Sequence, residues 1–348
     1  MQALPGPSRR RFLDAAFSRP TDTPPVWLMR QAGRYLPEYR EVRSRLGFLA
    51  LCEDVESAVE VSLQPFHRFG MDGVILFSDI LIPLRPMGLE VVLDDGGPRL
   101  PQPIRSAEDV RALRSFDPTA ETGFVPAIIR SLKREISGRA ALLGFCGAPW
   151  TLATYAVEGG SSRSFAGIKA MLHTAPALLD ELLNRLADAC GDYLAAQIEA
   201  GADAVQLFDT WAGELSRADY HRFARPATER LLARLPRRGE VPVILYASGS
   251  AHLLPALAET SADVLSVDWK LPLDEARPLA GGKALQGNVD PGALLGTPEG
   301  VAAAAIAARR AAGPTGHILN LGHGVLPLTP PGNVAAFVAA ARVPLSVS

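Results

Sequence analysis

Eight short apolar runs recur along the chain, and polar or charged residues follow each of them. The runs lie at 26–29, 74–77, 141–145, 204–208, 241–246, 263–267, 284–287 and 317–321. Short apolar runs bounded by turn residues are typical of buried strands, so each run is predicted to form a β-strand.

Segments rich in Ala, Leu, Glu and Arg separate these runs and have the spacing of helices. In 176–200, Leu179, Leu182, Leu183 and Leu186 form an apolar stripe, and Gly201 follows as a typical helix end. Strands that alternate with helices predict βαβ units and a parallel sheet. Nearly continuous apolar strands fit a sheet that is buried on both faces.

Eight such units predict an α/β protein, a single (β/α)8 TIM-type barrel with its active site at the C-terminal ends of the strands. The competing architecture is a doubly wound open sheet. Such a sheet usually carries a glycine-rich phosphate loop after its first strand, and residues 30–35, RQAGRY, do not match GxGxxG. We find no linker, so residues 1–348 are expected to form one domain. Residues 1–20 are expected to be a loose N-terminal tail leading into the first helix.

Composition and charge exclude several kinds of partner. Of the 348 residues, 48% are hydrophobic and 21% are charged, as in ordinary globular proteins. The formal net charge of −2 offers no basic field for nucleic acid or an anionic membrane surface. No apolar run approaches the ~18 residues of a membrane span. We therefore expect neither a nucleic-acid nor a membrane partner.

The three cysteines, Cys52, Cys146 and Cys190, are too few and too scattered for a disulfide framework or a CxxC metal site. This usage favours a reducing, cytoplasmic location, and no metal site is expected.

Chemically capable residues follow every predicted strand, and in a barrel these positions meet at the mouth. They include Arg30, Gln31, Arg34, Ser78, Asp79, Tyr155, Asp209, Thr210, Ser248, Asp268, Lys270, Asn288, Asp290 and His323. Arg30 and Arg34 at one strand end suggest an anionic ligand, because a guanidinium binds a carboxylate or phosphate through two hydrogen bonds. The alternative is that Arg34 and Glu38 form an ordinary i,i+4 pair on a helix surface.

Six motifs, taken together, resemble the uroporphyrinogen decarboxylase family. They are RQAGRYLPEYR (30–40), DGVILFSDIL (72–81), GFCGAPWTLATYAVEGGSS (144–162), LFDTWAGEL (207–215), QGNVDP (286–291) and NLGHG (320–324). They follow the family's order over about residues 24 to 335, a length that makes chance similarity very small.

The resemblance implies a single (β/α)8 barrel and a carboxy-lyase. The family removes the four acetate carboxyl groups of uroporphyrinogen III, which gives coproporphyrinogen III and CO2 in heme biosynthesis. It uses no metal and no organic cofactor, and it commonly forms homodimers. Loss of CO2 leaves an electron pair that needs a sink, and a protonated pyrrole ring beside a positioned carboxylate can supply one.

By resemblance, Asp79, Arg30 and Tyr155 are the catalytic residues. Asp79 is expected to bind the central pyrrole N–H groups, and Arg30 to act electrostatically, because an arginine pKa above 12 hinders proton donation. Tyr155 is expected to orient Asp79 or a substrate carboxylate. For Asp79, the alternative is a helix cap.

The remaining substrate-binding candidates surround these three residues. Arg34 is expected to bind substrate carboxylates, and Gln31 to add polar contacts at the same rim. His323 could hydrogen-bond a propionate or carry charge near neutral pH. Thr210 corresponds to a small hydroxyl residue that contacts substrate in the family. Phe208 and Tyr39 are weaker candidates for lining the pocket.

Three other functions compete with this interpretation. A thiolate-zinc methyltransferase needs cysteines at strand ends, where this chain has Ser248 and His323. A Schiff-base lyase could use Lys270, provided that its amine lies in an apolar pocket. A barrel that binds tetrapyrroles without converting them is excluded only by an assay.

Overall fold

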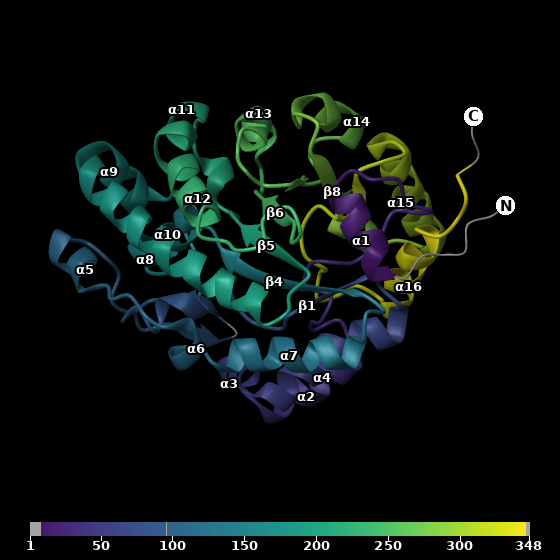
Figure 1. Ribbon diagram of the computed structural model, residues 1–348, viewed down its shortest axis with the longest axis horizontal. Helices are drawn as coiled ribbons and strands as arrows, with labels where there is room; N and C mark the ends of the chain where they lie inside the picture. The colour runs from purple at the N-terminus through teal and green to yellow at the C-terminus, as the bar shows by residue number, and fades with distance from the viewer. Residues whose placement is uncertain (1–7, 95, 346–348) are drawn as a thin grey trace.

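Seven parallel strands form one curved sheet in the computed structural model, which describes residues 8–94 and 96–345. The strands pair in chain order, β1-β4-β5-β6-β7-β8-β9, and helices surround the sheet (Figure 1). Their bounds are β1 Gly73–Ile75, β4 Ala141–Gly147, β5 Ala204–Phe208, β6 Val243–Tyr246, β7 Val264–Ser266, β8 Ala284–Val289 and β9 His317–Leu321. This order confirms the predicted barrel-type fold and excludes the doubly wound sheet, whose strand order reverses.

The run at 26–29 occupies the gap between β9 and β1 without becoming a regular strand. Val26 forms a single parallel bridge with Leu319, whose N–H donates to the Pro25 carbonyl at 2.9 Å. On the other side, the Asp72 N–H donates to the Val26 carbonyl at 2.8 Å. The run therefore joins the two edges of the sheet and closes the barrel.

Side chains, rather than a neighbouring strand, accept most of the backbone N–H hydrogen bonds of this run. The N–H groups of Val26, Leu28 and Met29 donate to the side chains of Asp72, Gln31 and Asn320. The prediction of a regular first strand is wrong for this reason, although the predicted position of the run in the barrel is right.

Sixteen α-helices are described within residues 8–94 and 96–345. They are α1 Ser8–Ala16, α2 Pro37–Arg45, α3 Phe48–Glu53, α4 Val55–Phe69, α5 Ala107–Ala112, α6 Pro118–Glu121, α7 Phe124–Ile136, α8 Pro149–Glu158, α9 Ala166–Thr174, α10 Pro176–Glu199, α11 Arg217–Asp219, α12 Arg225–Leu232, α13 Leu254–Ala258, α14 Leu273–Ala276, α15 Pro298–Ala312 and α16 Pro331–Ala340. The predicted leucine stripe of α10 is buried. None of the described helices is long and apolar enough to span a bilayer.

An antiparallel pair of short strands, β2 Val92–Asp94 and β3 Gly97–Arg99, lies between β1 and α5 in the chain. We did not predict this pair. Its signal is the DDGG stretch at 94–97, because Asp and Gly are typical of tight hairpin turns.

Helix α1 covers the amino end of the barrel. It contacts β1, β4, β8 and β9, and Phe12 is fully buried in a cluster that includes Ala141 and Ala284, the first residues of β4 and β8. Arg9 Nε donates to Asp203, just before β5, at 2.7 Å. The opposite end, where the strands finish, is thus left for the mouth. The expected loose tail is wrong for residues 8–16, while residues 1–7 lie outside the described part of the chain.

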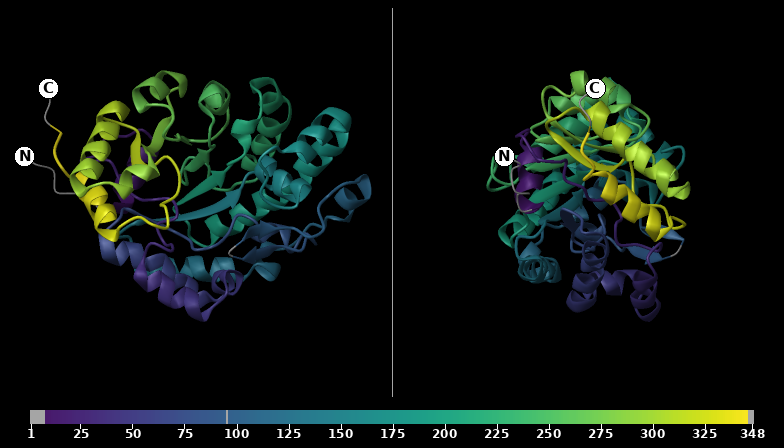
Figure 2. Two further views of the ribbon diagram at one scale, coloured as in Figure 1. Left: turned by 180° about the vertical axis from the view of Figure 1, so that it is seen from behind. Right: turned by 90° about the vertical axis from the view of Figure 1, so that its right-hand side faces the viewer.

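Asp72, directly before β1, connects both ends of the described chain. Its fully buried carboxylate accepts hydrogen bonds from Arg11 Nη1 at 2.8 Å, Arg342 Nη2 at 2.6 Å and the Val26 N–H at 2.8 Å. Figure 2 shows the first and last helices, α1 and α16, on the same side of the molecule.

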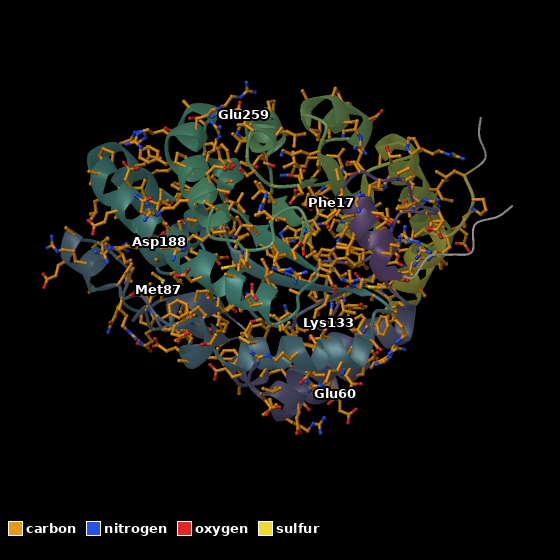
Figure 3. The ribbon with its side chains drawn as sticks, viewed as in Figure 1. Phe17, Glu60, Met87, Lys133, Asp188 and Glu259 are labelled. Atoms are coloured by element: carbon orange, nitrogen blue, oxygen red, sulfur yellow. The ribbon has the colours of Figure 1, made fainter. Side chains whose placement is uncertain are left out.

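A row of ion pairs covers the outer surface between α10 and the segment 222–234. Asp180 pairs with Arg222, Asp188 with Arg230 and Asp192 with Arg234. Asp188 is labelled over this region in Figure 3. Because these side chains are partly exposed, each pair contributes only about 0–1 kcal/mol.

Candidate active site

Arg30 stands at a sharp turn where the first run ends. Its backbone is left-handed, with φ of 58°, and the following Gln31 N–H donates to the Leu28 carbonyl at 3.1 Å. The Gln31 side chain accepts from the Leu28 N–H and donates to the Gly73 carbonyl, both at 3.3 Å. The turn presents Arg30 at the mouth with an exposed side chain.

The structure places Gln31 differently from our prediction. Its side chain is fully buried, and both ends of its amide bond to the main chain. Gln31 therefore supports the turn that carries Arg30, and the expectation that it offers polar contacts at the rim does not match this position.

Asp79 lies in the loop that follows β1, at the same end of the barrel as Arg30. Its Oδ1 accepts from the Leu81 N–H at 2.9 Å. Burial raises the pKa of the Asp79 carboxyl, whereas the Leu81 N–H and the Arg30 guanidinium act to lower it. The alternative that Asp79 caps the following helix is wrong, because the 3₁₀ turn Ile82–Leu84 has Leu81 at its N-cap and no side-chain cap hydrogen bond. One bond leaves further acceptor capacity on the carboxylate.

Tyr155 projects from α8 toward the same charges. Burial raises the pKa of its hydroxyl, the Asp79 charge raises it further, and the Arg30 guanidinium lowers it. Its ring centroid lies 5.9 Å from that of Trp211. The structure thus brings the three predicted catalytic residues, Arg30, Asp79 and Tyr155, into one electrostatic environment.

A buried network fixes α8 to the loop after β5. The Thr151 hydroxyl donates to Asp209 Oδ1 at 2.8 Å and accepts from the Trp211 N–H at 3.1 Å. The Trp150 indole N–H donates to the Trp211 carbonyl at 3.1 Å. Thr151 lies one helical turn before Tyr155, so this network holds the helix that carries Tyr155.

Asp209 is fully enclosed in that network. Burial raises the pKa of its carboxyl to about 7, against the lowering effect of the bonds to Thr151. Its Oδ2 has no hydrogen-bond partner among the described residues. The sequence pattern places Asp209 at a strand end and assigns it no role. An acid between an apolar run and a predicted ligand contact was the signal for it.

His323 follows β9 and lies in surroundings that favour its neutral ring. Burial and the Arg30 charge lower its pKa to about 4, while Asp268 acts to raise it. Its Nδ1 accepts from the Gly324 N–H at 2.6 Å, so the proton of the neutral ring lies on Nε2. This lowered pKa disfavours a charged His323 near neutral pH in the free protein, and the Nε2–H is directed to serve as a donor to a carboxylate.

Two candidates stand at the end of β5. The Phe208 ring is partly exposed and lies between those of Phe145 and Tyr246, with centroid distances of 5.6 and 5.9 Å. Thr210, two residues later, is half-buried beyond the strand end. Tyr39 is buried on α2, where its ring packs against Phe77.

Arg34 lies exposed in the turn before α2, and the alternative of a pair with Glu38 is wrong. Glu38 instead accepts from Arg68 of α4 at 2.9 Å. Among the described residues, the Arg34 guanidinium has no hydrogen bond or ion pair, so it is available to an anion. No contact joins it to Arg30 or Asp79.

The residues of the competing functions are placed unfavourably for them. Lys270 is exposed, and its ammonium lies 5.6 Å from the centroid of the Trp269 ring rather than in an apolar pocket. Cys52, Cys146 and Cys190 are free and buried. In the described ranges, no three His, Cys, Asp or Glu side chains are grouped to hold a metal ion.

Comparison with known proteins identifies the family of this chain. The model of the family described as uroporphyrinogen decarboxylase (URO-D) matches residues 7–343. The chain belongs to the uroporphyrinogen decarboxylase family. A uroporphyrinogen decarboxylase of Gloeobacter violaceus is 50% identical over 329 residues, which cover 94% of this chain and 95% of that protein. One of Myxococcus xanthus is 48% identical over 322 residues, covering 92% of each chain.

Solved structures support the barrel of the uroporphyrinogen decarboxylase family at much lower identity. A methyltransferase from Methanosarcina mazei superimposes with a TM-score of 0.81 at 21% identity, covering 96% of this chain and 98% of that one. A B12-independent methionine synthase from Shewanella sp. gives a TM-score of 0.58 at 13% identity, covering 83% and 86%. At such identities the likeness concerns the fold alone.

Proposed function

We propose that this chain removes the four acetate carboxyl groups of uroporphyrinogen III, giving coproporphyrinogen III and CO2 in heme biosynthesis. Family membership supports this activity, as do relatives of that name that are about half identical over almost the whole chain. The structural observation that carries the proposal is the grouping of Asp79, Arg30 and Tyr155 at the carboxyl ends of the strands.

The charges of this group match the substrate. A tetrapyrrole of this class has N–H donors at its centre and carboxylates around its edge. Asp79 offers a carboxylate for the central N–H groups, and these bonds favour its ionised form against the effect of burial. Arg30, Arg34 and the Nε2–H of His323 are donors for the carboxylates at the edge.

Each decarboxylation replaces CO2 by a proton. A proton first adds to the pyrrole carbon beside the acetate-bearing carbon and makes the ring a cation. The bond between the methylene and the carboxyl carbon then breaks, CO2 leaves, and the electron pair forms a double bond from the methylene carbon to the ring. A proton adds to the methylene carbon to give a methyl group, and the ring carbon releases its own. Asp79 stabilises the cationic stage electrostatically.

An anaerobic conversion assay tests the proposal. The purified protein is incubated with reduced uroporphyrinogen III and no added cofactor, and the products are oxidised and separated by chromatography. We expect porphyrins with seven to four carboxyl groups. A barrel that only binds tetrapyrroles gives the eight-carboxyl porphyrin alone, and that result would refute the proposed activity.

Further features of the family extend the proposal. We expect one domain, a cytosolic location consistent with three free, buried cysteines, and a homodimer. The homodimer is expected from the family, and the loop after β9 exposes Leu326 and Leu328, at 37% and 84%. Sedimentation at micromolar concentration tests the dimer, and a single species of 37.0 kDa would contradict it.

A further inference from the structure

Gly324 lies against the side chain of Arg30 and leaves no room for a side chain of its own. A Cβ built at Gly324 would stand 2.4 Å from Cδ, 2.6 Å from Cγ and 3.1 Å from Cβ of Arg30, which are its three nearest atoms. Real Cβ atoms do not approach carbon so closely. The Arg30 stem thus passes directly over the Gly324 backbone.

The obstacle at Gly324 is Arg30 and not the backbone conformation. The φ of Gly324 lies outside the left-handed region in which non-glycine residues are strained, unlike that of Gly313 or Gly316. Moreover, the nearest atoms belong to the stem, which begins at a fixed backbone position. Arg30 cannot avoid a new Cβ by moving its guanidinium alone.

Gly324 also holds His323. Its N–H donates to Nδ1 of that ring at 2.6 Å, which fixes the proton on Nε2. One residue without a side chain therefore meets two of the groups that are expected to bind substrate carboxylates.

We propose that Gly324 is a positioning residue that lets the Arg30 stem lie across the loop after β9, so that its guanidinium is directed toward Asp79 and Tyr155. The inference rests on the proposed function for its effect on turnover, but the geometry is independent of it. The positive charge of Arg30 acts on Asp79, Tyr155 and His323, which agrees with a guanidinium placed near all three.

The test is Gly324→Ala, observed first without substrate. The Arg30 charge lowers the pKa of His323, so moving the guanidinium away should raise the midpoint of the His323 imidazole in an NMR titration. If the protein is an active decarboxylase, kcat/KM should fall by about tenfold or more, because a displaced Arg30 guanidinium no longer meets the substrate in the right geometry. Gly332→Ala is the matched control, because a Cβ there meets nothing within 4 Å.

Two double variants distinguish the effect of the Arg30 stem from the effect of its charge. In an Arg30→Ala background, Gly324→Ala should leave the unfolding midpoint nearly unchanged and alter the remaining activity by no more than about twofold. The reason is that Cδ and Cγ, the two Arg30 atoms nearer than 3 Å, are gone, and only Cβ at 3.1 Å remains. In an Arg30→Gln background, the stem remains and Gly324→Ala should still lower the unfolding midpoint.

The outcomes distinguish the two proposals. An inactive wild type with a shifted His323 midpoint in Gly324→Ala refutes the decarboxylase activity alone. A His323 midpoint and an activity like those of the wild type refute the positioning role. If Gly324→Ala does not fold, Arg30→Ala must restore folding, and failure to do so also refutes it.

Discussion

At the scale of single residues, Asp79 shows how the site balances opposed effects. Burial favours its neutral form, whereas the Leu81 N–H and Arg30 favour the charged form. A carboxylate kept in such a place is ready to meet cationic or N–H-rich groups without much reorganisation. In a purely structural role, burying this carboxylate with so few partners would lower the stability of the fold.

Asp79→Asn should lower turnover by about 100-fold or more, because an amide cannot stabilise a cationic ring as a carboxylate does. The decarboxylation assay measures this loss, and circular dichroism checks the fold. Asp290→Asn, which changes an exposed acid after β8, is the matched control. A folded Asp79→Asn protein with near-normal turnover would remove the central role from Asp79.

His323 should titrate with a midpoint near pH 4 in the free protein, because burial and the Arg30 charge disfavour its cation. NMR of labelled histidine measures this midpoint, and the spectrum of His323→Gln assigns the signal. A midpoint at or above the ordinary value of 6.5 would show that the ring is a cation at mildly acidic pH and would contradict the neutral donor.

Arg34→Gln should raise KM for uroporphyrinogen while kcat changes little, since its unpaired guanidinium is expected to bind an edge carboxylate in ground and transition states alike. Arg45→Gln removes the same charge from an exposed position at the end of α2 and is the control. Equal KM values for the two variants would count against Arg34 as a substrate contact.

The sequence is a better guide to which residues reach the mouth of the barrel than to what each side chain contacts there. Asp79, Arg30 and Tyr155 are near enough for their charges to interact, and their catalytic roles stay predictions. Gln31 looked similar in sequence, but its amide is used by the main chain of Leu28 and Gly73. No pattern of spacing reveals which backbone groups a turn leaves unsatisfied.

At the scale of elements, hydrogen bonds hold the first turn of α8, and its second turn carries Tyr155, a predicted site residue. Thr151 and Trp150 are bound to the loop 209–211, and Tyr155 follows one turn later. The alternation of strands and helices could be predicted from the sequence, because apolar residues recur with a different spacing in buried strands and in amphipathic helices. The irregular run 26–29 and helix α1 could not be predicted in this way. Their positions depend on hydrogen bonds to Asp72 and Asp203, which are distant in sequence.

Asp209→Asn should stabilise the protein at pH 8 more than at pH 5. The folded pKa of Asp209, about 7, lies above the ordinary value of 3.8, so its contribution is complete below pH 3.8 and is lost as pH rises to 7. The loss is at most about 1.4 kcal/mol per pH unit, and asparagine avoids it. Thermal unfolding of both proteins from pH 5 to 8 measures the difference, with Asp290→Asn as control. A difference that does not change with pH would show that Asp209 does not titrate in this range.

At the scale of the whole molecule, the barrel is a ring that is closed by contacts between the beginning and the end of the described chain. The run 26–29 bonds to Asn320 and Leu319 on one side and to Asp72 on the other. Asp72 binds Arg11 and Arg342 at the amino end of the barrel, far from the mouth. Closure and catalysis are therefore assigned to opposite ends of the strands.

Asp72→Ala should lower the free energy of unfolding by about 3–5 kcal/mol, because it leaves the buried Arg11 guanidinium and the Val26 N–H short of a partner. Denaturant unfolding measures the change. Asp180→Ala, which breaks the partly exposed pair with Arg222, should cost about 1 kcal/mol or less. Similar losses for both variants would show that the buried cluster is no stronger than a surface pair.

The contacts of Asp72 also bear on how the protein is made. Asp72 and Arg342 are 270 positions apart, and Met29 and Asn320 are 291 apart. At 5–20 residues per second, a ribosome needs roughly 10–60 s to add the chain between such partners. During that time the nascent sheet is an open ribbon with unpaired edges, the kind of surface on which strands of other chains add. We therefore expect the need for cellular protection during synthesis to be greatest just before β9 emerges.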